Sequence, residues 1–275
     1  MIGSAGQKRV QDRFLKSLKI PLPPLPTQHK IVDILEKAEN LRKLRQQADE
    51  KMKDLIPSLF IKMFGDPAIN PKEWNTKTIK DIASKEKFSI RMGPFGSQLK
   101  KHELVDEGVK VLWIENIVNN KFEWKDNKCI TLEKYWQLKG FRVRPGDILT
   151  TTMGTIGKAC VVPENIGKAI ISSHLLKITL NSKLANPIFV AEYIRQPFAE
   201  KYFHKSSHGI VMKGLNTTII KSLPIYLPPL PLQQEFAKLV EDIEAEKVRQ
   251  AESKKKLDEL FQSLMQRAFT GELVA

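Results

Sequence analysis

One proline-rich stretch occurs twice in this chain of 275 residues. Residues 14–31 read FLKSLKIPLPPLPTQHKI, and residues 219–236 read IIKSLPIYLPPLPLQQEF, the same pattern displaced by 205 positions. The two copies match at ten of eighteen positions without a gap. An internal repeat indicates that two parts of a chain share one local structure, so it is interpreted before any single motif.

Each copy predicts a short strand followed by the sharp start of a helix. An apolar run precedes Pro-Pro-Leu-Pro, which disfavours a helix because proline fixes φ and lacks a backbone donor. Pro26 and Pro231 therefore mark helix starts. The expected helices run from 28 to 64 and from 233 to 269, and each would reach about 55 Å at 1.5 Å per residue.

Apolar residues recur with seven-residue spacing in both helices, which is typical of helices that pair along a seam. The expected seam residues are Ile31, Ile34, Leu41, Met52, Leu55 and Leu59 in the first helix and Phe236, Leu239, Ile243, Leu257, Leu260 and Leu264 in the second. Pro57 lies in the last third of the first pattern, so we expect a kink or a short separate helix there.

The segment between the helices alternates short β-type runs with turns. Expected strands lie at 109–115, 128–132, 147–152, 159–162, 169–173 and 175–180, and the clearest helical spacing lies at 188–203. Frequent Gly and Pro residues between these runs favour an irregular mixed sheet. We therefore expect an α+β chain in which one globular domain is flanked by two long helices.

This pattern divides the chain into four parts. Residues 1–27 resemble the end of a missing first domain, because they carry the same strand-and-proline element that closes the middle domain. The first long helix is expected at 28–66, the globular domain at 67–232 and the second long helix at 233–275.

The net charge of +14 is concentrated between the two helices. Residues 65–232 hold 25 Lys and Arg against 15 Asp and Glu, while both helical segments are nearly neutral. A polyanion such as nucleic acid is the natural partner of a basic domain. A basic surface exposed only to solvent is the alternative at this point.

Three polar, glycine-bearing segments are candidates for contact with DNA: 91–101, 150–158 and 204–213. Lysines suit phosphates, glycines allow a close approach of the backbone, and hydroxyl or amide groups suit base edges. The alternative is a set of ordinary surface turns. The expected DNA-binding residues are Arg91, Gly93, Phe95, Ser97, Gln98, Lys100, Lys101, Thr151, Thr152, Met153, Thr155, Lys158, Ser173, His174, Lys205, Ser206, His208 and Lys213.

No motif for catalysis satisfies its spacing requirements. The segment ending in Gly157-Lys158 is not a P-loop, because Thr152 occupies the first glycine position and Ala159 replaces the hydroxyl residue. Asn186-Pro187 is best interpreted as a helix start. Neighbours on a strand point to opposite faces, so a serine directly before a histidine is a poor nucleophile–base pair.

Composition sets further bounds on the class of protein. Cys129 and Cys160 have no partner motif, so neither a disulfide framework nor a cysteine zinc site is supported, and the histidines are too scattered for a metal site. No apolar run approaches about 18 residues, and the first ten residues lack the core of a signal peptide. We expect a cytoplasmic protein with no metal of its own.

These motifs together resemble the DNA-specificity subunit of type I restriction-modification systems. The resemblance rests on the doubled I-x-L-P-P-L-x-x-Q pattern, the Gly-Pro-Phe-Gly-Ser loop, Gly146-Asp-Ile-Leu149 and Gly154-Thr-Ile-Gly157. It implies domains that each read half of a split double-stranded DNA site, separated by antiparallel paired helices that dock methyltransferase subunits. It also implies a non-catalytic chain without a cofactor: the partner methyltransferase is expected to use S-adenosylmethionine, and the partner restriction and translocase subunit ATP and Mg.

The chain departs from that family pattern because it holds one complete recognition domain instead of two. We expect a two-fold homodimer that restores two readers and recognises a palindromic split site. The alternative is a coiled-coil assembly protein, without catalytic activity, whose basic domain binds RNA or an acidic protein. Selective binding to duplex DNA would separate the two.

Overall fold

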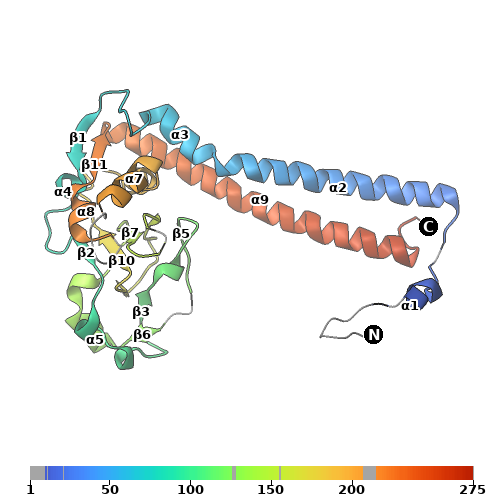
Figure 1. Cartoon of the computed structure of the whole chain (residues 1–275), viewed down its shortest axis with the longest axis horizontal. Helices are drawn as coiled ribbons and strands as arrows, with labels where there is room; N and C mark the ends of the chain where they lie inside the picture. Colours follow the sequence, from blue (N-terminus) through green and yellow to red (C-terminus); the bar gives the residue numbers. More distant parts are fainter. Residues whose placement is uncertain are drawn as a thin grey trace. The chain divides into compact units, whose positions relative to one another are not determined.

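The computed structural model describes residues 10, 12–20, 22–125, 128–154, 156–206 and 215–274 (Figure 1). The chain forms two compact units. One consists of Met1–Lys53 and Glu244–Ala275, called here the helical unit. The other, Asp54–Ile243, is called the globular unit.

The helical unit pairs helix α2 (Leu25–Lys53) with the later part of helix α9 (Leu230–Thr270), and the short helix α1 (Asp12–Ser17) precedes them. Arg42 Nε donates to Asp258 Oδ1 at 2.8 Å, and Lys254 Nζ lies 3.4 Å from Asp49 Oδ2. From the first contact to the second, the residue number rises in α2, from 42 to 49, and falls in α9, from 258 to 254, so the two helices run antiparallel. Both begin three residues before the expected start, with Pro26 and Pro231 in the first turn.

The α2–α9 seam in the helical unit is more polar than the heptad pattern predicts. The Arg42 guanidinium lies on the seam, 4.5 Å from the ring centroid of Phe261. Because Arg42 faces α9, the preceding Leu41 turns outward and is 51% exposed, and Leu260 is 50% exposed. Of the other predicted seam residues, Ile31, Ile34, Met52, Leu257 and Leu264 are half-buried.

A break at Asp54 separates α2 from a second helix, α3 (Leu55–Phe64), with Pro57 in its first turn. The expected short helix is therefore present, and it belongs to the globular unit. Leu59, Phe236 and Ile243 pack in the core of that unit instead of along a seam. Two further predicted seam residues, Leu55 and Leu239, are exposed.

The described residues of the globular unit form four small sheets. The four-stranded sheet has the order β2 (Ile90–Met92), β10 (Leu175–Ile178), β7 (Ile148–Thr151) and β8 (Ala159–Val161), all antiparallel. The three-stranded sheet has the order β6 (Cys129–Ile130), β3 (Val109–Leu112) and β9 (Ala169–Ile171), with β3 and β9 parallel. The pairs are β1 (Asn75–Thr78) with β11 (Pro224–Leu227), and β4 (Ile117–Val118) with β5 (Lys121–Phe122). The α+β class and the mixed sheet are confirmed, and all six expected strands are present.

Short helices connect these strands. They are α4 (Ile79–Ile82), α5 (Leu132–Gln137), α6 (Pro187–Ile194), α7 (Pro197–Ser206) and α8 (Thr217–Ser222), with the 3-10 turns η1 (Gly96–Gln98), η2 (Lys101–Glu103), η3 (Ile114–Asn116) and η4 (Lys139–Phe141). The single helix expected at 188–203 is divided into α6 and α7, because proline is favoured in the first turn of a helix and Pro197 starts a new one.

Two hydrophobic cores lie on the two faces of the four-stranded sheet. Neighbours on β7 show the division, since Ile148 packs in the first core and Leu149 in the second. The first core includes an aromatic cluster in which Phe60 lies 5.6 Å from Phe236 between ring centroids. Because α3 and the start of α9 complete this core, the globular unit extends beyond the expected limits of 67 and 232.

Within the described part of the chain, none of the helices combines the length and the apolar character needed to cross a membrane.

Candidate nucleic-acid interface

One end of the four-stranded sheet gathers several of the segments singled out by sequence. Met92 at the end of β2 pairs with Leu176, and Leu175 at the start of β10 pairs with Thr151 at the end of β7. Thr150 in turn pairs with Ala159 at the start of β8. The segments 93–101, 152–154 with 156–158, and 172–174 therefore all lie at this end of the sheet, which we call the loop end.

Gly93 fixes the base of the first loop by close packing. A Cβ atom at this position would lie 1.9 Å from the carbonyl oxygen of Ser172, so no other residue fits without moving the backbone. The Gly93 N–H donates to Leu175 O at 2.9 Å. Gly93 is buried, so its role is to hold the loop against the Ser172 segment and not to contact a ligand directly.

The tip of the first loop is exposed and closed by its own hydrogen bonds. Phe95 N donates to Gln98 Oε1 at 3.1 Å, and Gln98 N donates to Phe95 O at 2.9 Å. Phe95, Ser97, Gln98, Lys100 and Lys101 are all exposed. The tip therefore presents an aromatic ring, a hydroxyl, an amide and two ammonium groups on an ordered turn.

Glu103 ties this loop to α5. Its carboxylate accepts from Lys100 N at 2.6 Å and from Lys134 Nζ at 2.6 Å. The backbone N–H of Lys100, and then the Lys134 ammonium, hold the pKa of the Glu103 carboxyl below its ordinary value. The anchoring cation is Lys134, so the bonds to Glu103 engage no ammonium group of Lys100 or Lys101.

The second loop, which we call the glycine loop, comprises Met153, Gly154 and 156–158. Thr151 N donates to Lys158 O at 3.0 Å at its base, and both Gly154 and Gly157 have positive φ. Met153 is exposed and Lys158 is half-buried. Thr151 and Thr152 are fully buried in strand and core, which corrects their assignment as DNA contacts.

Three further predicted contact residues have packing roles or partial burial. The Arg91 guanidinium lies 4.2 Å from the ring centroids of both Phe88 and Phe141. This stacking gives Arg91 a role in packing β2 against η4 and does not point to a DNA contact. Ser173 and His174 are half-buried at the loop end, where His174 O accepts from Thr152 N.

The third candidate segment is only partly described. Lys205 is exposed and Ser206 half-buried, both at the end of α7. Leu215 N donates to Thr152 O at 2.9 Å, so the chain returns to the loop end after the segment. Thr155, His208 and Lys213 lie outside the described residues.

One element at the loop end was not expected from the sequence, the turn Asn119-Asn120 between β4 and β5. Both residues have positive φ, 49° and 63°, as a two-residue hairpin turn requires. Asn120 Oδ1 accepts from Ala159 N at 3.3 Å, which places the turn beside the start of β8. The signal was the Asn-Asn pair, because asparagine tolerates positive φ better than most residues.

Charge at the other end of the sheet is buried and structural. Asp147 Oδ1 accepts from Thr179 Oγ1 at 2.5 Å, and Lys177 Nζ lies 3.9 Å from Asp147 Oδ2. Burial raises the pKa of Asp147 and lowers that of Lys177. Asp147 and Lys177 are thus buried and paired with each other, whereas the polar side chains at the tip of the first loop are exposed to solvent.

The cysteines do not form a reactive site in this structure. Cys129 and Cys160 are both buried, and burial raises the pKa of the Cys160 thiol to about 12. Among the described residues, no group of three or more His, Cys, Asp or Glu side chains is arranged to hold a metal ion.

The chain combines a globular unit, whose sheet carries polar loops at one end, with a unit of two paired helices. The family model of the type I restriction modification DNA specificity domain matches residues 1–53 and 71–261. The chain therefore belongs to this family.

Curated relatives and solved structures agree with that membership. The EcoBI specificity subunit of Escherichia coli is 24% identical, and the match covers 98% of this chain and 61% of that subunit. The MjaVIII specificity subunit of Methanocaldococcus jannaschii is also 24% identical, over 98% of this chain and 65% of the relative. The present chain thus spans less than two thirds of the length of these two relatives.

The structural comparison shows the same fold. The HsdS subunit from Thermoanaerobacter tengcongensis superposes with a TM-score of 0.61 at 18% identity, covering 99% of this chain and 65% of that one. A chain from a structure of type I R-M complex assembly superposes with a TM-score of 0.66 at 20% identity. This match covers 96% of the present chain and 64% of the other chain.

Proposed function

We propose that this chain reads one half of a split double-stranded DNA site through the major groove, as the specificity subunit of a type I restriction-modification complex. The observation that carries this proposal is the loop end of the sheet, where Ser97, Gln98, Lys100 and Lys101 are exposed on an ordered turn at the same end as the glycine loop. An amide side chain can pair with a base edge, and lysines bind phosphates in any sequence.

The roles of these residues are separable. Lys100 and Lys101 supply affinity, because phosphate contacts carry no sequence information. Gln98 supplies selectivity, because its amide is both a donor and an acceptor. Its Oε1 already accepts from Phe95 N, which fixes the orientation of the amide and leaves its N–H groups directed elsewhere.

The test is binding to duplex DNA at several salt concentrations. Replacing Lys100 and Lys101 by Ala should weaken binding to every sequence and reduce the salt slope by about 1.8, since each phosphate that is no longer neutralised lowers the slope by about 0.9. Gln98→Ala should instead change the preferred base. Lys80→Ala with Lys183→Ala is the matched control, since both lysines are exposed and away from the loop end. Equal effects of all these changes, or tighter binding to RNA, would contradict the proposal.

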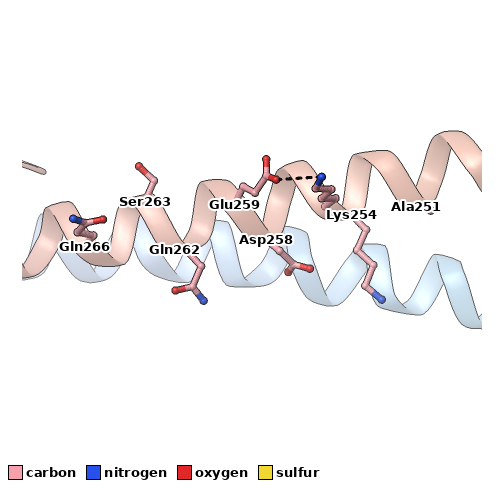
Figure 2. A pocket seen from close by; sticks show the side chains of 8 residues that line it. Ala251, Lys254, Asp258, Glu259, Gln262, Ser263 and Gln266 are labelled. Atoms are coloured by element: carbon pink, nitrogen blue, oxygen red, sulfur yellow. Dashed lines mark ion pairs between the residues drawn. The ribbon is translucent and has the colours of Figure 1, made fainter.

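The paired helices serve as the docking surface for methyltransferase subunits in this proposal. Figure 2 shows polar side chains along α9 that line a shallow groove, with Lys255 and Glu259 paired at 3.9 Å. Methyl transfer with S-adenosylmethionine and ATP-driven, Mg-dependent translocation then belong to partner chains. Gln262→Glu with Gln266→Glu should weaken co-purification with the methyltransferase subunit. Unchanged co-purification would show that the methyltransferase subunit does not bind at this groove.

The proposal also includes a homodimer that presents two readers. In the first copy of the repeat, the apolar side chains equivalent to core residues of the globular unit are exposed. They are Phe14, Leu15, Leu18 and Ile20, against the buried Ile219, Ile220, Leu223 and Ile225. Burying such a surface favours association, and two identical readers would recognise a palindromic site.

Light scattering tests the homodimer directly. The wild-type chain should have the mass of two copies at micromolar concentration, and Ile20→Asp with Leu22→Asp should shift it towards one. A wild-type monomer would contradict this part of the proposal and leave the DNA-reading part standing.

A further inference from the structure

Arg195, at the C-terminal end of α6, joins three segments of the globular unit. Its Nε and Nη2 donate to Ala159 O at 2.9 and 2.6 Å, at the start of β8. Nη2 also donates to Asn120 O, in the turn between β4 and β5. Nη1 pairs with Glu192, one turn earlier on α6. One side chain thus connects α6, the hairpin turn and the strand that follows the glycine loop.

Helix α6 is a rigid anchor for this side chain. Asn186 caps its first turn by accepting from Ile188 N and Phe189 N, and Phe189 and Val190 are fully buried. The Glu192 side chain is only 7% exposed and that of Arg195 20% exposed. Hydrogen bonds to a charged group are stronger away from water, so this connection resists separation.

The turn held by Arg195 presents an unassigned polar group at the loop end. Asn120 faces inward and is bonded through both its carbonyl oxygen and its side chain, while Asn119 is exposed. An exposed asparagine amide has the donor and acceptor that pair with the N6 and N7 atoms of adenine. Positive φ at both residues fixes the direction of the turn.

We propose that Arg195 is a positioning residue that holds the Asn119-Asn120 turn against the start of β8, directly after the glycine loop, so that turn and loop form one reading edge, with Asn119 contacting a base. This inference rests on the proposed DNA-reading function. Lysine cannot replace arginine here, because a single ammonium lacks the planar fork that bonds Ala159, Asn120 and Glu192 at once. Loss of these hydrogen bonds should therefore reduce selectivity between bases while leaving the phosphate contacts in place.

The experiment compares wild type and Arg195→Lys in selection from a randomised duplex DNA library, using the whole chain. The ratio of affinity for the selected site over a scrambled site should fall about tenfold, the size expected when one base-specific interaction is removed. Affinity for the scrambled site and its salt slope should stay within about twofold, because no phosphate-binding lysine is changed. Arg144→Lys is the control: it is an exposed arginine paired with Glu86 before β7, away from the loop end.

A second variant keeps the test independent of folding. Asn119→Gly removes the exposed side chain and tolerates the positive φ of this position, so it should relax selectivity at one base position with little change in the thermal midpoint. Unchanged base preference in Asn119→Gly, or an unchanged affinity ratio in a folded Arg195→Lys, would overturn the inference.

The two levels of failure can be told apart. A wild-type chain that selects no duplex sequence contradicts the proposed function. A wild-type chain that selects a site, with variants that select it equally well, contradicts only the role of Arg195 and Asn119.

Discussion

The two copies of the repeated stretch show how one sequence pattern keeps its local structure but not its burial. In both copies a glutamine reaches back five residues: Gln28 Nε2 donates to Pro23 O and Gln233 Nε2 to Pro228 O, each at 2.7 Å. Both helices start at the same position of the repeat. Yet Ile20 is 70% exposed, whereas its equivalent Ile225 is fully buried.

The difference arises from what surrounds the second copy. Strand β1 pairs with β11, with Lys77 opposite Ile225, and Ile79 N donates to Leu223 O at 3.1 Å. Gln233 is also fully buried, where its Oε1 accepts from Asn186 N at 2.9 Å. Local sequence therefore sets the turn and the helix start, while burial comes from elements distant in the chain. Matched substitutions in the two copies measure each contribution.

The largest expected difference is between Ile225→Ala and Ile20→Ala. Truncation of the buried Ile225 should lower the free energy of unfolding by about 2–5 kcal/mol, since it leaves a cavity in the core. The same change at the exposed Ile20 should stay within about 0.5 kcal/mol. Urea denaturation of the two variants at low protein concentration checks this. Similar losses at both positions would show that the two copies are buried alike in solution.

A smaller contrast is expected between Gln233→Ala and Gln28→Ala. The first change leaves the part-buried N–H of Asn186 and the buried carbonyl of Pro228 without this partner, at a cost of about 1–3 kcal/mol. The second removes one partly buried bond and should cost about 1 kcal/mol or less. Denaturation midpoints give both values, and a costlier Gln28→Ala would reverse the comparison.

The smallest effect concerns the cap that follows β1, and it depends on pH. The hydroxyl and the backbone N–H of Thr78 donate to Asp81 Oδ2 at 2.7 and 2.8 Å, which lowers the pKa of Asp81. A pKa that is lower in the folded state gives stability that is present above the unfolded value, about 3.9, and is lost as pH falls through the folded value.

Thermal unfolding of wild type and Asp81→Asn tests that sign. The wild-type midpoint should be higher at about pH 7, and the gap should narrow as the pH falls below the unfolded pKa of about 3.9 and through the lower folded pKa. A gap that widens in acid would show that this carboxylate is not stabilised by the cap.

Sequence alone predicted the parts of the fold that depend on local chemistry. Proline placed the starts of α2 and α9 within three residues, and β-branched runs placed strands such as β7 and β10. The seam was predicted less well, because heptad spacing does not reveal that Arg42 would face α9 in place of Leu41. The separate short helix around Pro57 was expected, but the sequence did not show that it would join the globular unit, since this depends on where Phe60 and Phe64 enter the core.

The candidate site shows the same limit. The loops were found from glycine, hydroxyl and lysine content, and the sheet topology brings two of them to one end. Burial of Thr151 and Thr152 and the stacking of Arg91 could not be predicted, because they depend on strand pairing and on Phe141, fifty residues away. Arg195 was missed for the same reason: its partners Ala159 and Asn120 are distant in sequence.

Single-molecule mapping of methyladenine in the source genome, with and without this gene, tests the central claim most directly. We predict that a two-part motif loses its methylation when the gene is removed, and that the motif is palindromic if the homodimer forms. Methylation that is unchanged across the genome, in cells that produce the chain together with its methyltransferase subunit, would contradict the account.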